Sequence, residues 1–272
     1  CCGFDSVPSD IGTLMMVEHL RARGEGCRVV RSGFQIKGGM SGGTAASGLL
    51  LMEDPDGPAS LADSHYLDPV AHRAFKGEWT GDPLGPWFDP DLKRWTSFFF
   101  MAPINTRIVR RSAGLYALQG HAYGPQFEYR ERMIMGRTLP RVTAAAIGAG
   151  MAASGAMGRF GPTLAMMKRL APAPGTGPSE AERDAGFTRT RYVAIGDGGT
   201  VAHGELFSEG DPGYKVTSVF LTEAALTLAL TPRDALPGGA DYGGILTPAT
   251  ALGVPYIERL RAAGIKLEVT SG

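Results

Sequence analysis

The strongest constraint on the fold lies in the last third of the chain, where two strand-forming runs flank a tight-turn sequence. The runs cover residues 187–195 and 200–207, and Asp197-Gly198-Gly199 separates them. Asp-Gly pairs favour the turns that join antiparallel strands, so this segment predicts a β-hairpin. Helical and strand patterns are interspersed along the rest of the chain. We therefore predict an α/β (α+β) fold with a mixed sheet.

The other elements are placed by capping residues and apolar spacing. Ser6 or Ser9 can cap a first helix, which ends at Gly24. A strand is expected over 29–37, and the Pro-, Gly- and Asp-rich stretch 54–95 is expected to be an ordered excursion with short helical turns. Further elements are predicted as helices over 44–51, from Pro103, over 215–230 and over 248–263, and as a strand over 265–269.

Charge and composition exclude one broad class of function. The chain has 27 basic and 27 acidic residues, whereas an electrostatic nucleic-acid binder needs a basic excess on some face. Hydrophobic residues make up 43% of the 272 residues, which is enough to bury a substantial core. We expect one large domain, or one and a half, and no nucleic-acid partner.

Cysteine and histidine usage gives no metal site. Of the three cysteines, Cys1 and Cys2 are adjacent and Cys27 stands alone, which favours a reduced, cytosolic compartment over a disulfide framework. The five histidines lie far apart in the sequence and show no metal-ligand spacing. No Gly-x-Ser-x-Gly motif is present, so a serine hydrolase is not supported.

An uncharged stretch over 142–157 raises the question of membrane contact. A spanning helix needs roughly 20 apolar residues, so this stretch is too short, and its glycines weaken a helix. We predict a tightly packed helical hairpin, an insertion around 138–171. The alternative is an interfacial helix that contacts lipid. The glycines expected to allow close backbone approach are Gly148, Gly155 and Gly158.

A glycine-rich segment at 38–44 reads Gly-Gly-Met-Ser-Gly-Gly-Thr. Its backbone N–H groups could cradle a phosphate at the start of a helix. No Lys-Ser/Thr pair follows, as it would in a P-loop. A tight strand-to-helix connection that needs glycine geometry is an equal alternative.

Seven blocks along the chain resemble one family in the same order. The first, residues 1–10, reads Cys-Cys-Gly-Phe-Asp-Ser-Val-Pro-Ser-Asp, and the second is the glycine-rich segment. The other blocks lie at 102–112, 123–131, 174–180, 211–214 and 243–250. Together they resemble saccharopine dehydrogenase-like oxidoreductases, and among these the trans-acting enoyl reductases of bacterial complex-lipid synthesis.

The resemblance implies two parts. Residues 1–24 would be the terminal strand-and-helix remnant of a Rossmann-like NAD(P)-binding domain, and 25–272 a mixed α/β substrate and dimerisation domain. Members begin with a Gly-rich dinucleotide-binding unit that this sequence does not contain. We therefore expect the chain to be the downstream part of a larger protein, and to bind no NADP and turn over no substrate alone.

The resemblance also places the first block beside the cofactor, NADP or NAD. Most of that binding site is expected on the missing N-terminal part. Plain helix capping is the alternative for Asp5 and Asp10. The residues implied to contact the cofactor are Cys2, Gly3, Phe4, Asp5 and Ser6.

A hydride-transferring enzyme needs donors that position the substrate and stabilise a developing enolate, because the cofactor carries the difficult step. Each candidate donor has a structural alternative. Lys37 would be a solvated strand end, Arg107 part of a charged helix face, and Tyr214 a core aromatic residue. The candidate catalytic residues are Lys37, Ser41, Thr44, Arg107 and Tyr214.

Three functions remain open. The first is an NAD(P)-dependent oxidoreductase that reduces an activated double bond in a lipid or polyketide-type substrate. The second is a non-catalytic scaffold of the same fold at lipid surfaces, and the third an amino-acid dehydrogenase of the saccharopine type, which the lipid-related blocks disfavour. We expect a cytoplasmic protein with an acyl or lipid substrate. Peripheral contact with the plasma membrane and a homodimer are further expectations.

Overall fold

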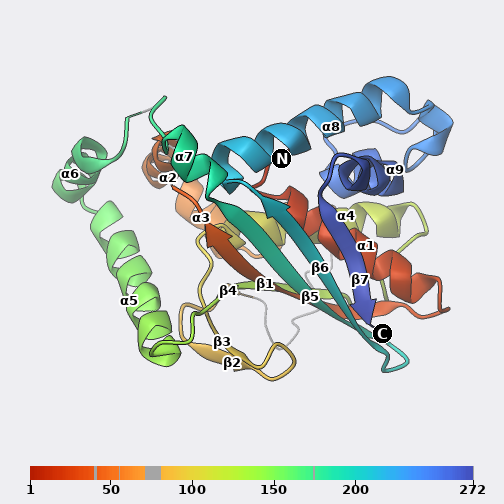
Figure 1. The fold of residues 1–272 in the computed structure, drawn as a ribbon, viewed down its shortest axis with the longest axis horizontal. Coiled ribbons are helices and arrows are strands. Elements are labelled where there is room, and N and C mark those ends of the chain that lie inside the picture. The colour runs from red at the N-terminus through yellow and green to blue at the C-terminus, as the bar shows by residue number, and fades with distance from the viewer. Residues whose placement is uncertain (40–41, 55, 71–80, 174, 272) are drawn as a thin grey trace.

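The computed structural model describes residues 1–272 except 40–41, 55, 71–80, 174 and 272 (Figure 1). The described residues form a seven-stranded sheet of order β2-β3-β4-β1-β5-β6-β7. Among these strands β1 and β4 run parallel and the other neighbours pair antiparallel, so the predicted mixed sheet is confirmed. The strands are β1 (Cys27–Lys37), β2 (Trp87–Asp89), β3 (Arg94–Ser97), β4 (Glu128–Ile134), β5 (Phe187–Gly196), β6 (Val201–Glu209) and β7 (Lys266–Ser271).

The hairpin predicted around Asp197-Gly198-Gly199 is confirmed. It joins β5 to β6, which pair antiparallel along their length. Gly199 adopts a φ of 94°, a conformation that strains any residue with a side chain. Glu25 accepts hydrogen bonds from the backbone N–H of Gly198 and from the hydroxyl of Thr200, which ties the turn to the segment before β1.

One face of the sheet is covered by helices (Figure 1). These are α1 (Val7–Arg21), α4 (Ala102–Leu118), α8 (Thr217–Leu230) and α9 (Pro248–Ala262). The central helix, α1, packs across β1, β5, β6 and β7 and against α4 and α9, and α8 packs on α9. Ile11 and Met16 of α1 are fully buried, and Tyr192 of β5 donates a 2.7 Å hydrogen bond to the Pro8 carbonyl. The boundary expected near residue 24 thus falls between two elements that pack together.

Two further helices, α5 (Pro140–Gly158) and α6 (Gly161–Leu170), project from the body of the molecule (Figure 1). A Cβ on Gly148 would lie 2.2 Å from the Leu84 carbonyl oxygen, and one on Gly158 would lie 2.9 Å from the Met52 sulfur, so both glycines allow close approach. Gly155 has nothing within 4 Å and does not. In the described part of the chain, no helix is long and apolar enough to cross a membrane.

The remaining helices are short, and three strands go beyond the sequence prediction. Residues 54–95 contain a helix as expected, but also β2 and the start of β3. The sequence pattern does not predict β4, because four of its seven residues are charged: Glu128, Arg130, Glu131 and Arg132. The short helices are α2 (Gly42–Glu53), α3 (Gly57–Ala62) and α7 (Glu180–Asp184), and a single π-helical turn, Pro212–Val216, precedes α8.

Candidate functional site

Strand β4 places two polar side chains on the helix-covered face of the sheet. Its parallel register with β1 sets Tyr129 beside Val30 and Glu131 beside Ser32. Because Val30 belongs to the core beneath α1, Tyr129 and Glu131 point the same way. Both side chains are buried. The strand that the sequence pattern missed therefore carries a carboxyl group into the interior.

Glu131 is the centre of this buried cluster. Its Oε2 accepts hydrogen bonds from the Ser9 hydroxyl at 2.6 Å and from the Tyr129 hydroxyl at 2.8 Å. Its Oε1 has no hydrogen-bond partner among the described residues. Burial raises the pKa of Glu131 to about 7, although the hydrogen bonds from Ser9 and Tyr129 lower it in part. Glu131 therefore holds a proton for much of the time near neutral pH.

The first turns of α1 and α4 meet at the same place. Ser6, at the start of α1, donates a 3.1 Å hydrogen bond to the side-chain oxygen of Asn105 in α4. Asn105 also lies close enough to Glu131 to lower its pKa. The Asn105 amide nitrogen and the Ser32 hydroxyl are nevertheless buried with no hydrogen-bond partner among the described residues. Each such group costs about 1–3 kcal/mol, so this cluster is not arranged for stability alone.

A small cavity opens beside the cluster. It is lined by Ser32, Tyr129 and Glu131, and by Asp82 and Thr106 across from them. Its volume is about 20 Å³, enough for one ordered water molecule. The described residues leave no room for a substrate there. The cluster can therefore act by holding a proton or by fixing the two helix starts, and not by enclosing a reacting carbon.

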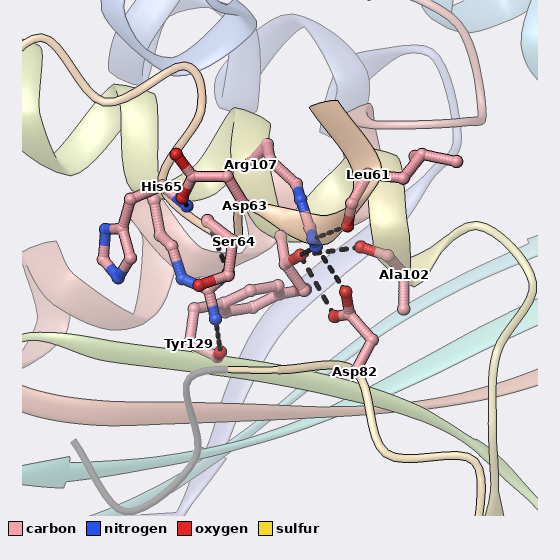
Figure 2. A network of polar contacts seen from close by, with 10 residues as sticks. Leu61, Asp63, Ser64, His65, Asp82, Ala102, Arg107 and Tyr129 are labelled. Atoms are coloured by element: carbon pink, nitrogen blue, oxygen red, sulfur yellow. Dashed lines mark hydrogen bonds and ion pairs between the residues drawn. The ribbon is translucent and has the colours of Figure 1, made fainter. Parts of the chain in front are cut away.

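Two arginines of α4 secure the segments around the cavity. Figure 2 shows Arg107 pointing toward Asp82, with which it forms an ion pair, and toward the carbonyl of Leu61. Arg110 donates to the carbonyl oxygens of Ser64 at 2.8 Å and Tyr129 at 3.4 Å. Burial lowers the pKa of Arg110 to about 10, so it stays charged at neutral pH. Arg107 and Arg110 therefore do not form an exposed charged helix face. They are buried, and they bind the backbone of the segments around the cavity.

Asp10 contrasts with Glu131, because both of its oxygens are occupied. One accepts a hydrogen bond from the Ser112 hydroxyl, and the other accepts a 2.7 Å hydrogen bond from the backbone N–H of Ala249 in the first turn of α9. Burial raises the pKa of Asp10 to about 7. Asp10 is a helix cap, as the alternative reading proposed, but it caps α9 and not its own helix.

The predicted catalytic residues lie in two places. Lys37 is exposed at the end of β1, and the Tyr214 hydroxyl donates a 2.9 Å hydrogen bond to the Thr176 carbonyl. Thr44 is half-buried in α2, and Ser41 lies outside the described residues. Arg107 is buried in α4, as described above. The side-chain hydrogen bonds of Arg107 go to Asp82, Thr106 and Leu61, and the catalytic roles of all these candidates stay predictions.

The end of β1 nevertheless gathers three of the sequence blocks. A Cβ on Gly38 would lie 2.7 Å from Pro212, and one on Gly177 would lie 2.5 Å from the Tyr214 ring. The glycine-rich segment and the blocks at 174–180 and 211–214 therefore touch one another. Carboxyl ends of parallel strands are where ligands collect in open α/β folds, and β1 and β4 both end on this side.

The residues predicted to contact the cofactor are partly engaged in packing. The Phe4 backbone N–H donates a 2.7 Å hydrogen bond to Thr217, and its ring stacks on Phe220 with centroids 6.5 Å apart. Gly3 lies against the same Thr217 hydroxyl, Cys2 is half-buried against the core, and Ser6 is buried against Asn105. Asp5 is exposed beside the start of α1. Their role toward a cofactor stays a prediction.

Four residues of the cluster are not among the predicted site residues, although the sequence holds a signal for them. Ser9, Asn105, Tyr129 and Glu131 come from three different blocks of the family resemblance. The structure brings these blocks, at 1–10, 102–112 and 123–131, into contact. If polar residues of these three blocks had been assumed to lie close together, the sequence would have predicted this cluster.

Comparison with known proteins agrees with the part of the resemblance that concerns trans-acting enoyl reductases. Over 294 aligned residues the chain is 42% identical to the Mycobacterium tuberculosis (strain ATCC 25618 / H37Rv) protein named "Putative trans-acting enoyl reductase Rv2449c". It is 33% identical to a trans-acting enoyl reductase of Mycobacterium bovis (strain BCG / Pasteur 1173P2) over 287 residues, and 33% identical to one of Mycobacterium ulcerans (strain Agy99) over 293 residues. Each alignment covers 99% of this chain.

The chain spans 66% of the length of each of these relatives. A further third of each relative therefore lies outside the alignment. No protein-family model matches the chain, and no solved structure matches it.

Proposed function

We propose that the full protein is an NAD(P)-dependent enoyl reductase, which reduces an activated carbon–carbon double bond in a lipid or polyketide-type acyl substrate. The main support for this proposal is the similarity, over 99% of the chain, to proteins named trans-acting enoyl reductases. Enoyl reductases are oxidoreductase enzymes that act on small acyl substrates. We further propose the saccharopine dehydrogenase-like fold family and a cytoplasmic location, which the three free cysteines favour.

The described residues of this chain fit the edge of a nicotinamide cofactor site. The start of α1 carries the positive end of a helix dipole, and Asp5 is exposed beside it. The rest of the cofactor site is proposed to lie in the part of the relatives outside the alignment. When bound, the nicotinamide would supply the hydride for the double bond.

In this proposal the buried cluster positions the start of α1. Glu131 holds Ser9, and Asn105 holds Ser6, so both contacts fix the first turn of the helix that carries the family signature. Glu131 and Asn105 come from different elements, β4 and α4, so the turn is held from two directions. We propose them as positioning residues, because the described residues leave no room for a substrate beside them.

Reduction of a double bond also needs a proton at the second carbon, after hydride reaches the first. Tyr129 and Glu131 form a hydrogen-bonded pair that holds protons near neutral pH. The adjoining cavity has room for one water molecule to continue this chain of hydrogen bonds. The pair can therefore buffer a proton close to the helix start.

Lipid analysis of a deletion strain tests the function. We expect loss of the gene to cause accumulation of acyl lipids that keep one more double bond, with amino-acid pools unchanged. The full-length gene should restore the saturated lipids. Altered lysine metabolism with unchanged lipids would contradict the proposal and support the amino-acid dehydrogenase.

A further inference from the structure

The helix pair α5–α6, with the preceding Leu139, presents large apolar side chains to solvent. We call residues 139–170 the arm. Leu139, Phe160 and Leu170 have exposed fractions of 67%, 61% and 76%. The described residues of α6 include none that is buried, and in α5 only Ala144, Gly148 and Gly158 are buried. The arm therefore packs on the body through few buried residues and leaves most of its surface uncovered.

The exposed surface of α5 is uncharged along its whole centre. Residues 142–157 include no Asp, Glu, Lys or Arg, and Thr143 and Ser154 are the polar side chains among them. An exposed helix of a globular protein normally presents charged residues on its outer face. This composition indicates that something apolar meets α5.

Charge around the arm is segregated, although the chain as a whole is neutral. No acidic residue occurs between positions 132 and 180. Among the described residues, one of the basic side chains, Lys168, pairs with an acidic one, Glu53. The basic residues of this stretch are Arg137, Arg141, Arg159, Lys168 and Arg169. They flank the uncharged centre at both ends, so the arm combines an apolar surface with a positive border.

This pattern argues against a second copy of the chain as the occupant. A two-fold symmetric contact through the arm would place the same basic border against itself, and like charges repel. It also offers little to a specific protein partner, because the uncharged centre has few hydrogen-bonding groups. Apolar insertion combined with attraction to negative charge is the pattern of a helix that lies in a membrane interface.

We propose that the arm docks on an anionic lipid surface, with Leu139, Val142, Phe160 and Leu170 entering the interface and the basic border contacting the headgroups. The 19 residues of α5 make a helix about 28 Å long at 1.5 Å per residue, which suits lying flat along a surface. Each basic residue near an anionic surface strengthens binding about fivefold. The inference rests on the arm alone and does not depend on the proposed activity.

Vesicle co-sedimentation of the full-length protein tests this docking. We expect binding to vesicles of phosphatidylglycerol and phosphatidylcholine, weaker binding to phosphatidylcholine alone, and loss of binding at high salt. Replacing Arg141 and Arg159 together by Gln should weaken binding about 25-fold. The double variant Phe160→Asp, Leu170→Asp should abolish it.

A matched control separates the arm from apolar exposure in general. Leu228 and Leu230 of α8 are exposed to 56% and 65%, and their double replacement by Asp should leave vesicle binding unchanged. Circular dichroism of each variant shows whether it is folded. Equal binding by the arm variants and the control, or no binding to anionic vesicles, would overturn the proposal. So would binding to an acidic protein without binding to vesicles.

Discussion

Ser9 of the first helix donates its hydroxyl hydrogen bond to Glu131 of the fourth strand across 2.6 Å, although 122 residues separate them in the sequence. This contact joins the family signature at the start of α1 to a buried carboxyl group whose second oxygen has no partner among the described residues. The cluster therefore links the position of the signature turn to the protonation of Glu131.

Stability should fall as pH rises, because folding raises the pKa of Glu131 from 4.5 to about 7. The folded state binds the proton of Glu131 more tightly than the unfolded state does. The stabilisation that results is complete below pH 4.5 and is lost as pH rises through about 7. Glu131→Gln should remove a pH-dependent loss of about 3 kcal/mol in the free energy of unfolding. Urea unfolding across this range measures it. The exposed Glu258→Gln variant should keep the wild-type slope, and an unchanged slope in Glu131→Gln would contradict the assignment.

Removing the Ser9 hydroxyl should destabilise the protein and raise the pKa of Glu131 further. Ser9→Ala leaves the Glu131 Oε2 with the Tyr129 hydroxyl as its remaining donor, at a cost of about 1–2 kcal/mol. The pH at which stability falls should move upward, since the Ser9 hydrogen bond holds that pKa down. The exposed Ser218→Ala variant is the control. A lower pH midpoint in Ser9→Ala would be inconsistent with this geometry.

Two helix glycines should respond in opposite directions to alanine. A Cβ on Gly12 of α1 would lie 2.2 Å from the Tyr192 ring, so Gly12→Ala should cost at least about 1–3 kcal/mol through overpacking. Gly48 of α2 has nothing within 4 Å, so Gly48→Ala should gain roughly 0.5–1 kcal/mol from better helix propensity. Thermal unfolding of both variants checks the pair. Tolerance of Gly12→Ala would show that α1 does not pack this tightly on β5.

Arg107 should contribute to the stability of the fold, whether or not it takes part in catalysis. Arg107→Met leaves Asp82 without its guanidinium partner, which should cost about 3 kcal/mol, the lower end for a broken buried pair. The exposed Arg233→Met variant should cost little. Urea unfolding together with the rate of the full-length enzyme separates the roles. Full stability with lost activity would support direct catalysis instead.

The sequence predicts the elements whose signals are local. Asp197-Gly198-Gly199 predicts the hairpin because the turn geometry depends on those residues alone. Pro248 and Gly264 likewise bound the last helix closely. Strand β4 escapes prediction because four of its seven residues are charged, and some of their partners lie far away in the sequence. Arg132, for example, donates to the carbonyl oxygens of Pro83 and Gly85.

The candidate site escapes prediction for the same reason. Glu131 belongs to no sequence motif of its own. Its pKa depends on burial, which raises it, and on residues such as Ser9 of α1 and Asn105 of α4, which lower it in part. Asp10 shows the converse, since capping was anticipated but the helix it caps lies 239 residues away. The sequence therefore predicts the kind of interaction that such a residue makes, but not which distant residue is its partner.

The most direct test of the central claim uses the full-length protein with NADPH and an α,β-unsaturated acyl thioester. The absorbance of NADPH and the mass of the acyl product are followed together, for the wild type and Glu131→Gln. We predict that the wild type oxidises NADPH in equimolar amount to the double bonds it reduces. An acyl chain that stays unsaturated, with no binding or oxidation of NADPH or NADH, would contradict the account.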